Sequence, residues 1–235
     1  MTTSKAPTSE GYQAKQPSTR TVERALVLLS AVAEGSTGGT LTELARSAEL
    51  SPSTAGRLLN TLAQQGFVRR DEDSRYGPGA RMKQIAAATL REEPLYELVG
   101  PHLIALAEET GETANLGVAT DDDKVLYLRQ VSSGQLVQTA TWTGRTIPLE
   151  STALGRALTG EVAAGEYVTS HRDDSDITAV SAPIVNHAGE IVGAISINAP
   201  VYRTSESATH TFGAALTAHA KEISLALGAS LDLFE

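Results

Sequence analysis

The sequence contains no cysteine, which excludes disulfides, thiolate nucleophiles and thiolate metal ligands together. It also lacks an apolar run of the roughly 18 residues needed to span a bilayer. Residues 1–18 are rich in Ser, Thr, Pro and Gln and have no apolar segment of the kind found in secretory signals. We therefore expect a cytoplasmic protein with no membrane partner, in which residues 1–18 form a disordered tail.

Charge is distributed unevenly along the 235 residues, whose formal net charge is −9. Residues 20–83 carry nine basic and seven acidic side chains, a net charge of +2, whereas residues 84–235 carry eight and twenty, a net charge of −12. An acidic segment repels phosphate, so any contact with nucleic acid is expected in the N-terminal part. The length fits two domains of about 100 to 200 residues each.

Three helices are predicted in the N-terminal segment. Apolar residues recur at helical spacing over residues 21–32. Thr40 and Glu43 form a capping box that begins a second helix. Ser51, an N-cap residue, is followed by Pro52 at the first helical position, so a third helix begins within a few residues of the second.

The third helix has an outer face suited to DNA. This face carries short hydrogen-bonding side chains and one arginine, with no acidic residue: Ser53, Thr54, Arg57, Asn60, Thr61 and Gln64. Such groups match base edges and phosphates in a major groove. A merely solvated helix face would have the same composition, but two helices joined by a tight turn are the helix-turn-helix arrangement, which favours DNA binding.

A β-hairpin is predicted directly after this helix, with strands at residues 67–70 and 75–77. Its basic side chains, Arg69, Arg70 and Arg75, are candidates for contact with the DNA backbone or minor groove. A solvated hairpin without DNA contact is the alternative interpretation of the same residues.

These elements resemble the DNA-binding domain of the isocitrate lyase regulator (IclR) family of transcriptional regulators. The similar motifs are LTELA at 41–45, SPSTAGRLLNTL at 51–62 and GFV with YGPG within 66–79. Pro78 departs from the family pattern, which usually has an aliphatic residue there. The resemblance implies a winged helix-turn-helix domain over residues 19–80.

A helical connector is predicted next. Residues 80–93 favour a helix that Pro94 interrupts, and an apolar helical stripe resumes until Gly111. We assign residues 81–94 to a linker helix between domains. The resemblance implies that these helices contribute to dimer contacts, with packing inside one chain as the alternative.

The remaining residues, 95–235, are predicted to form an effector-binding and oligomerisation domain. Strands are expected at 113–119, 125–131, 136–142 and 191–197, with a long closing helix from Ser205 to about Ala229. The resemblance implies a GAF-like α/β domain with an antiparallel sheet, and the whole chain is then of the α+β class.

The segment 144–157, GRTIPLESTALGRA, resembles the family's effector-domain signature. Ser151 or Thr152 is expected to cap a helix whose first backbone N–H groups, at Ala153 and Leu154, would bind a carboxylate. A capped helix without a ligand is the alternative.

Three further residues complete the predicted effector site. Ser196 and Asn198 lie two positions apart and therefore share one face of a strand, and Arg145 belongs to the signature segment. Asn198 stands where the family usually has serine. The segment 160–180 is shorter than in such regulators, which leaves the shape of the pocket open.

Catalytic, metal and cofactor sites are not expected. No G-x-S-x-G motif surrounds a serine. The histidines considered as ligands, His102, His187, His210 and His219, have no metal-ligand spacing on one helix face. We expect surface or core histidines and no enzymatic activity.

The sequence therefore predicts a sequence-specific DNA-binding regulator, a repressor rather than an activator, modulated by a small and carboxylate-containing effector. A homodimer or homotetramer is expected on a roughly palindromic operator. The predicted DNA-binding residues are Ser53, Thr54, Arg57, Asn60, Thr61, Arg69, Arg70 and Arg75. A constitutive DNA binder whose C-terminal domain serves only oligomerisation, and a small-molecule hydrolase, remain as alternatives.

Overall fold

The computed structural model describes residues 19–35, 38–136, 138–150, 152–171 and 176–235. The chain divides into two compact units, Met1–Ala86 and Ala87–Glu235. The tail expected at residues 1–18 lies outside the described residues. Within the described ranges, no helix has the length and apolar character that crossing a bilayer requires.

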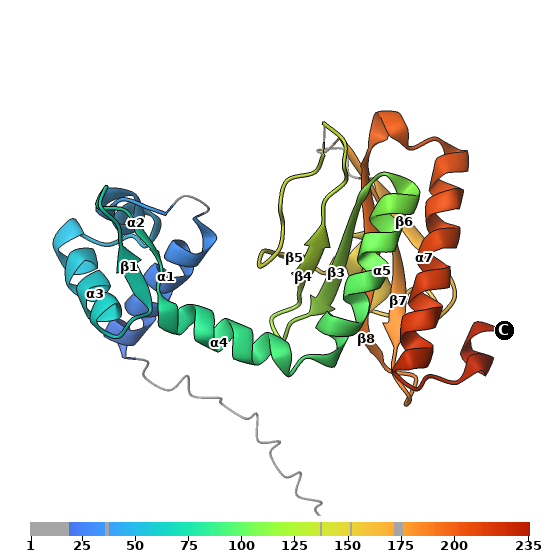
Figure 1. Cartoon of the computed structure of the whole chain (residues 1–235), viewed down its shortest axis with the longest axis horizontal. Helices are drawn as coiled ribbons and strands as arrows, with labels where there is room; N and C mark the ends of the chain where they lie inside the picture. The colour runs from blue at the N-terminus through green and yellow to red at the C-terminus, as the bar shows by residue number, and fades with distance from the viewer. Residues whose placement is uncertain (1–18, 36–37, 137, 151, 172–175) are drawn as a thin grey trace, which may run out of the picture. The chain divides into compact units, whose positions relative to one another are not determined.

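The first unit contains three helices and a two-stranded hairpin (Figure 1). Its elements are α1 (Arg20–Glu34), α2 (Leu41–Ser47), α3 (Pro52–Gln64), β1 (Val68–Arg70) and β2 (Tyr76–Pro78), and α4 (Ala80–Arg91) begins in it. The strands pair antiparallel, and Val68 is opposite Pro78. The helix-turn-helix and hairpin predicted from sequence are confirmed, and Pro78 is accommodated as the last residue of its strand.

Local capping explains where α2 and α3 begin. The Thr40 backbone N–H donates to the Glu43 carboxylate over 2.8 Å, and the Glu43 N–H donates to Thr40 Oγ1 over 3.3 Å. The first of these bonds is the main reason that the pKa of Glu43 lies below its ordinary value. Ser51 accepts from the Thr54 N–H, and Pro52 follows it in the first turn. Both predicted caps are confirmed.

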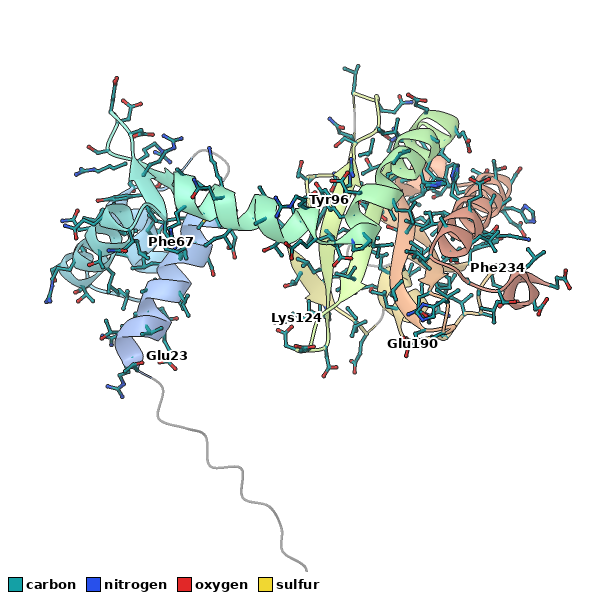
Figure 2. The ribbon with its side chains drawn as sticks, turned by 60° about the horizontal axis from the view of Figure 1, so that its bottom comes forward. Glu23, Phe67, Tyr96, Lys124, Glu190 and Phe234 are labelled. Atoms are coloured by element: carbon teal, nitrogen blue, oxygen red, sulfur yellow. The ribbon has the colours of Figure 1, made fainter. Side chains whose placement is uncertain are left out.

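The second unit is built on a six-stranded sheet in the order β5-β4-β3-β8-β7-β6, and all neighbouring strands are antiparallel. The strands are β3 (Thr113–Ala119), β4 (Lys124–Val131), β5 (Thr146–Pro148), β6 (Val168–His171), β7 (Ile177–Val185) and β8 (Ile191–Pro200). Its helices are α5 (Pro94–Thr110), α6 (Ala153–Leu158) and α7 (Glu206–Ala226), with short 3-10 turns at Val201–Arg203 and Leu231–Phe234. Lys124 begins β4, and Glu190 directly precedes β8. Both residues lie at the same end of the sheet (Figure 2).

Each face of the sheet has its own apolar core. Helices α5 and α7 lie side by side on one face (Figure 1), where they bury Ile195 and Ile197 of β8. The neighbouring Ala194 belongs instead to the cluster around α6 on the other face. This alternation is what a strand covered on both faces requires.

Two sequence expectations about the second unit are corrected. The described residues of 136–142 form no strand; β4 pairs with β3 on one side and with Thr146–Pro148 on the other. The sequence analysis also did not identify β6 and β7, although β7 is a nine-residue central partner of β8. The long closing helix is confirmed and begins after Ser205, which accepts from the Ala208 N–H.

Candidate functional site

The outer face of α3 is open to solvent. Ser53, Arg57, Asn60 and Thr61 are exposed, and Thr54 is half-buried. The Thr61 hydroxyl donates to the Arg57 carbonyl over 3.1 Å. The polar ends of Arg57 and Asn60 form no hydrogen bond with the described residues, so both side chains are well placed to reach a partner.

The hydroxyls at the beginning of α3 belong to its cap. The Ser51 hydroxyl lies 3.1 Å from that of Ser53 and 2.9 Å from that of Thr54. A hydroxyl in such a cluster can still donate or accept one further bond. Ser53 and Thr54 therefore remain available to a backbone phosphate beside the helix N-terminus.

A shallow hollow joins α3 to α1. It is lined by Thr21 and Arg24 of α1 and by Thr54, Arg57, Leu58 and Thr61 of α3. Arg24 is exposed, so two guanidinium groups border one concave surface. Sequence reasoning did not single out Arg24, because only its neighbours on another helix distinguish it from the other basic residues.

The three hairpin arginines have different surroundings. Arg69 and Arg70 are exposed; Arg70 lies 5.6 Å from the ring centre of Tyr76, and Arg69 lies against Gly77. Arg75 is held inside the unit: its guanidinium donates to the Gly38 carbonyl over 2.8 Å and lies 3.6 Å from the Glu43 carboxylate. These two contacts tie the Arg75 side chain to α2 and to the segment that precedes it.

A cavity of about 370 Å³ opens on the α6 side of the six-stranded sheet. Its lining is mostly apolar and includes the tilted ring pair of Tyr127 and Trp142, whose centres are 5.7 Å apart. The lining residues are Tyr127, Gln138, Thr139, Ala140, Trp142, Ile147, Thr152, Ala153, Leu154, Ser170, Ile177, Ala179 and Asn198. No side chain in this described lining carries a charge.

The segment that precedes β5 forms one wall of the cavity. The Gln130 side chain holds this wall: its Oε1 accepts from the Trp142 N–H over 2.8 Å, and its Nε2 donates to the Ala140 carbonyl over 3.3 Å. A glutamine side chain therefore takes the place of a neighbouring strand. The Thr139 Oγ1 atom, also in this wall, is buried and has no hydrogen-bond partner among the described residues.

A row of buried polar side chains crosses three strands behind the cavity. Asn115 and Ser181 are the register partners of Ser196. Asn115 Nδ2 donates to Ser196 Oγ over 3.3 Å, and Ser196 Oγ donates to Asn198 Oδ1 over 3.4 Å. Ser196 is not among the described residues that line the cavity. Its hydrogen bond orients Asn198, which does line the cavity. The sequence missed Asn115 and Ser181, which only strand pairing brings into this row.

The predicted helix cap at the beginning of α6 is confirmed at Thr152. Thr152 is the N-cap and accepts from the Gly155 N–H over 3.0 Å, while Ser151 lies outside the described residues. The Ala153 N–H is not free for a carboxylate, because it donates to Ser170 Oγ over 2.9 Å. The side chains of Ala153 and Leu154 form part of the apolar wall of the cavity.

Arg145 is absent from the described lining. Its guanidinium carbon lies 5.6 Å from the ring centre of Trp142. Since Trp142 itself lines the cavity, Arg145 supports a wall residue through a cation–π contact. It is exposed to solvent.

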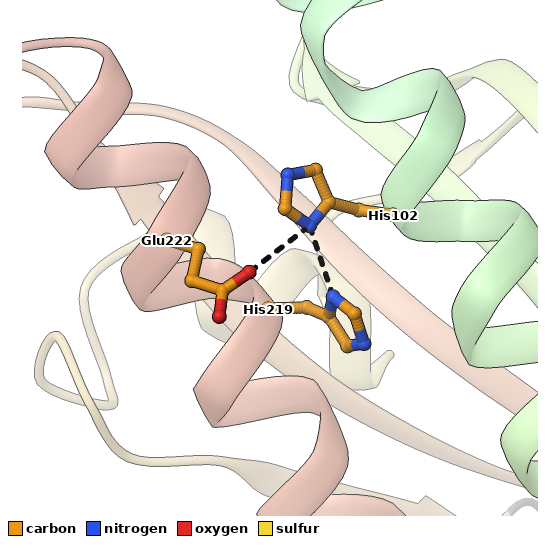
Figure 3. Close-up of side chains that lie close together, drawn as sticks. All are labelled: His102, His219 and Glu222. Carbon is orange, nitrogen blue, oxygen red and sulfur yellow. Dashed lines mark hydrogen bonds and ion pairs between the residues drawn. The ribbon is translucent and has the colours of Figure 1, made fainter.

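Two of the histidines considered in the sequence analysis come together in the second unit. His102 of α5 and His219 of α7 lie 2.9 Å apart between their Nδ1 atoms (Figure 3). Burial and the neighbouring His219 lower the pKa of His102 below its ordinary value. Spacing within one helix could not reveal this pair, because its members are 117 positions apart.

Comparison with known proteins gives matches over both units. The family model described as the IclR helix-turn-helix domain matches residues 21–72. The model described as the bacterial transcriptional regulator IclR C-terminal domain matches residues 87–170 and 162–225.

Individual relatives match almost from end to end. The chain is 30% identical to the transcriptional repressor IclR of Escherichia coli, over 89% of this chain and 90% of that protein. It is 27% identical to the HTH-type transcriptional regulator BhcR of Paracoccus denitrificans, over 92% and 90%.

Solved structures have the same fold at lower identity. The Thermotoga maritima IclR is 23% identical, with a TM-score of 0.67 over 88% of this chain and 98% of that one. An IclR homologue from Microbacterium hydrocarbonoxydans, crystallised with 4-hydroxybenzoate, is 20% identical, with a TM-score of 0.72 over 89% and 100%.

Proposed function

The chain belongs to the IclR family of bacterial transcriptional regulators, and we propose that it is a cytoplasmic repressor that binds operator DNA and responds to a small aromatic effector. The observation that carries this proposal is the pairing, in one chain, of an exposed helix face without acidic residues and an uncharged cavity in a separate unit.

The DNA-binding role rests on α3. Arg57 and Asn60 are of the residue types that bind guanine and adenine edges, and we assign base contacts to them. Ser53, Thr54 and Thr61, with Arg69, Arg70 and the newly identified Arg24, are assigned to phosphate or minor-groove contacts. Arg75 instead positions the hairpin, through its bonds to Gly38 and Glu43.

The effector role rests on the cavity. Aromatic walls from Tyr127 and Trp142 suit a planar apolar body, and Ser170, Thr139 and Asn198 supply neutral hydrogen-bonding groups. The ligand class that fits is a small aromatic with a polar end. A carboxylate at that end would be held by neutral donors, because no cation belongs to the described lining.

A homologue of the same fold was crystallised with 4-hydroxybenzoate, a molecule of this class. Because the two chains are only 20% identical, the argument for this chain depends on its own cavity. We propose a homodimer, or a dimer of dimers, whose two α3 helices enter successive major grooves. We propose no catalytic step, since the described cavity lining contains no acidic, basic or histidine side chain.

Selection of bound sequences from random duplex DNA tests the DNA-binding role. The wild type should enrich an inverted repeat, whereas the Arg57→Ala/Asn60→Ala double variant should lose that preference. The matched control is Gln65→Ala, an exposed polar position at the C-terminal end of α3. Failure of the wild type to enrich any sequence, with or without aromatic acids, would contradict the proposal.

The single tryptophan of the chain gives a direct test of the effector role. Because Trp142 lines the cavity, a ligand that enters it should change the tryptophan fluorescence in a saturable way. A panel of neutral aromatics and aromatic acids separates the two ligand classes. If no member of the panel binds, the C-terminal unit serves oligomerisation alone and the protein is a constitutive DNA binder.

A further inference from the structure

A cluster of metal-binding side chains lies between α5 and α7, on the helical layer opposite α6 and separate from the cavity. It consists of His102 from α5 and of His219 and Glu222 from α7 (Figure 3). The ligand atoms of these three residues all lie within 4.8 Å of one another. His219 and Glu222 are three positions apart and therefore share one face of α7.

Two separations in this cluster are close to those between ligands of one metal ion. The two Nδ1 atoms are 2.9 Å apart, and His102 Nδ1 lies 3.7 Å from Glu222 Oε2. With metal–ligand bonds of about 2.0 to 2.1 Å, two ligands are about 2.9 Å apart at a right angle and about 3.3 Å apart at the tetrahedral angle. Both observed separations differ from the tetrahedral value by about 0.4 Å, which small side-chain rotations can supply.

A second carboxylate lies next to His219, on the side away from His102. Glu109 Oε1 of α5 lies 3.5 Å from His219 Nε2, the ring nitrogen that faces away from His102. A carboxylate at this position favours the tautomer with its proton on Nε2 and leaves the lone pair of Nδ1 directed at the cluster. Carboxylate–histidine pairs of this kind commonly support metal ligands.

A hydrogen bond between two neutral imidazoles would account for the 2.9 Å contact alone. Such a bond would not require the Glu222 carboxylate near His102 Nδ1, nor the Glu109 carboxylate near His219 Nε2. We propose that His102, His219 and Glu222 form a three-ligand site for a divalent transition metal, Zn²⁺ being the best match, and that Glu109 is its positioning residue.

The donor set determines which ion is expected. Imidazole nitrogens with one carboxylate suit Zn²⁺, Ni²⁺ or Cu²⁺, whereas Mg²⁺ and Ca²⁺ prefer oxygen ligands throughout. The histidine side chains are 20% and 14% exposed, and that of Glu222 is 67% exposed. The ion would therefore be anchored on its inner side and would keep a position open to water.

Occupancy of this site would link α5 to α7. Both helices pack on the same face of the sheet, and their contact closes the core of the second unit. An ion that binds only the folded state adds to its stability. Occupancy of the proposed site would therefore stabilise the packing of α5 against α7, on the face of the sheet opposite the cavity.

Isothermal titration of the full-length, untagged and metal-free protein with ZnCl₂ tests the proposal. One Zn²⁺ per chain should bind to the wild type, and MgCl₂ should give no heat of binding. His219→Gln and Glu222→Gln should each lower the affinity at least 100-fold, and Glu109→Gln about tenfold. His210→Gln is the matched control, because His210 is an exposed histidine on the same helix.

Glu222→Gln keeps the experiment informative even if the histidine variants fail to fold, since this side chain is largely exposed. Its circular dichroism should match that of the wild type. The proposal is overturned if the wild type binds no Zn²⁺, or if Glu222→Gln and His219→Gln bind it as tightly as the wild type does. Replacement of Zn²⁺ by Co²⁺ provides an independent readout, because nitrogen and oxygen ligation gives visible absorption bands that the His219→Gln variant should lack.

Discussion

The arginines of the first unit show how surroundings separate residues of one type. Arg57 and Arg69 are exposed, whereas the guanidinium of Arg75 bonds to Gly38 and lies beside Glu43. Exposed arginines on a DNA-facing surface can bind phosphate or base, but an arginine with internal partners contributes mainly to the fold. Composition alone would treat them alike.

We predict that Arg69→Ala weakens binding to operator and to unrelated duplex DNA by similar factors, because a phosphate contact carries no sequence information. The slope of log affinity against log salt should fall by about 1. Fluorescence anisotropy of labelled duplexes across a salt series measures both quantities. Loss of affinity for the operator alone would show that Arg69 reads a base instead.

Arg75→Gln should act on stability. The loss of the bond to Gly38 and of the ion pair with Glu43, at a side chain that is 34% exposed, should lower the free energy of unfolding of the first unit by about 1 kcal/mol. Urea unfolding followed by far-ultraviolet circular dichroism measures this loss of stability. Arg70→Gln, an exposed neighbour in the same hairpin, is the control and should change stability by less than half as much.

Asn198→Ala should weaken effector binding at least tenfold. Asn198 is the residue of the Asn115–Ser196–Asn198 hydrogen-bond row that lines the cavity, and its amide can bond a ligand there. Trp142 fluorescence titration measures the change. Unchanged affinity would remove Asn198 from the effector site.

At the scale of elements, short-range rules were sufficient for the helices. The Thr40 and Ser51 caps and the break before Pro94 depend on residues within one turn, so the sequence located α2, α3, α4 and α5. The cavity could not be located in this way. Its walls come from β4, β5 with the segment before it, α6, β6, β7 and β8, and only strand pairing brings these elements together.

The segment 136–142 shows where prediction from the sequence pattern failed. Its alternation suits a strand, but in the structure Gln130 supplies the hydrogen bonds that a neighbouring strand would give. The lining of the cavity was predicted in part: Ala153, Leu154 and Asn198 belong to it, whereas Tyr127, Trp142 and Ser170 were not identified from the sequence. Their positions depend on contacts between distant parts of the chain.

An ion pair joins the residue before β3 to the 3-10 turn that follows β8. Arg203 donates to both carboxylate oxygens of Glu112 over 2.6 and 2.8 Å, and the Glu112 side chain is 5% exposed. Glu112→Gln should lower the free energy of unfolding of the second unit by about 2 kcal/mol, because a half-buried guanidinium loses its counter-charge. Urea unfolding followed by Trp142 fluorescence reports on this unit alone, and a change below about 0.5 kcal/mol would contradict the estimate.

For the whole molecule, DNA binding and effector binding are assigned to different units. If the effector changes operator affinity, the operator must change effector affinity by the same factor. We expect a coupling of about 5- to 150-fold, absent from any variant that no longer binds the effector. Titrations of each ligand in the presence of the other measure it, and unequal factors would show that a second site is involved.

The central claim, that α3 reads DNA sequence, is tested most directly with Arg57→Ala. Its affinity and that of the wild type would be measured for the selected operator and for a scrambled duplex over a range of salt concentrations. A loss of about 1 to 3 kcal/mol on the operator, with little change on the scrambled duplex, is the predicted result. Equal losses on both duplexes, with a reduced salt slope, would show that Arg57 contacts only phosphate and would contradict the account of α3 as the sequence reader.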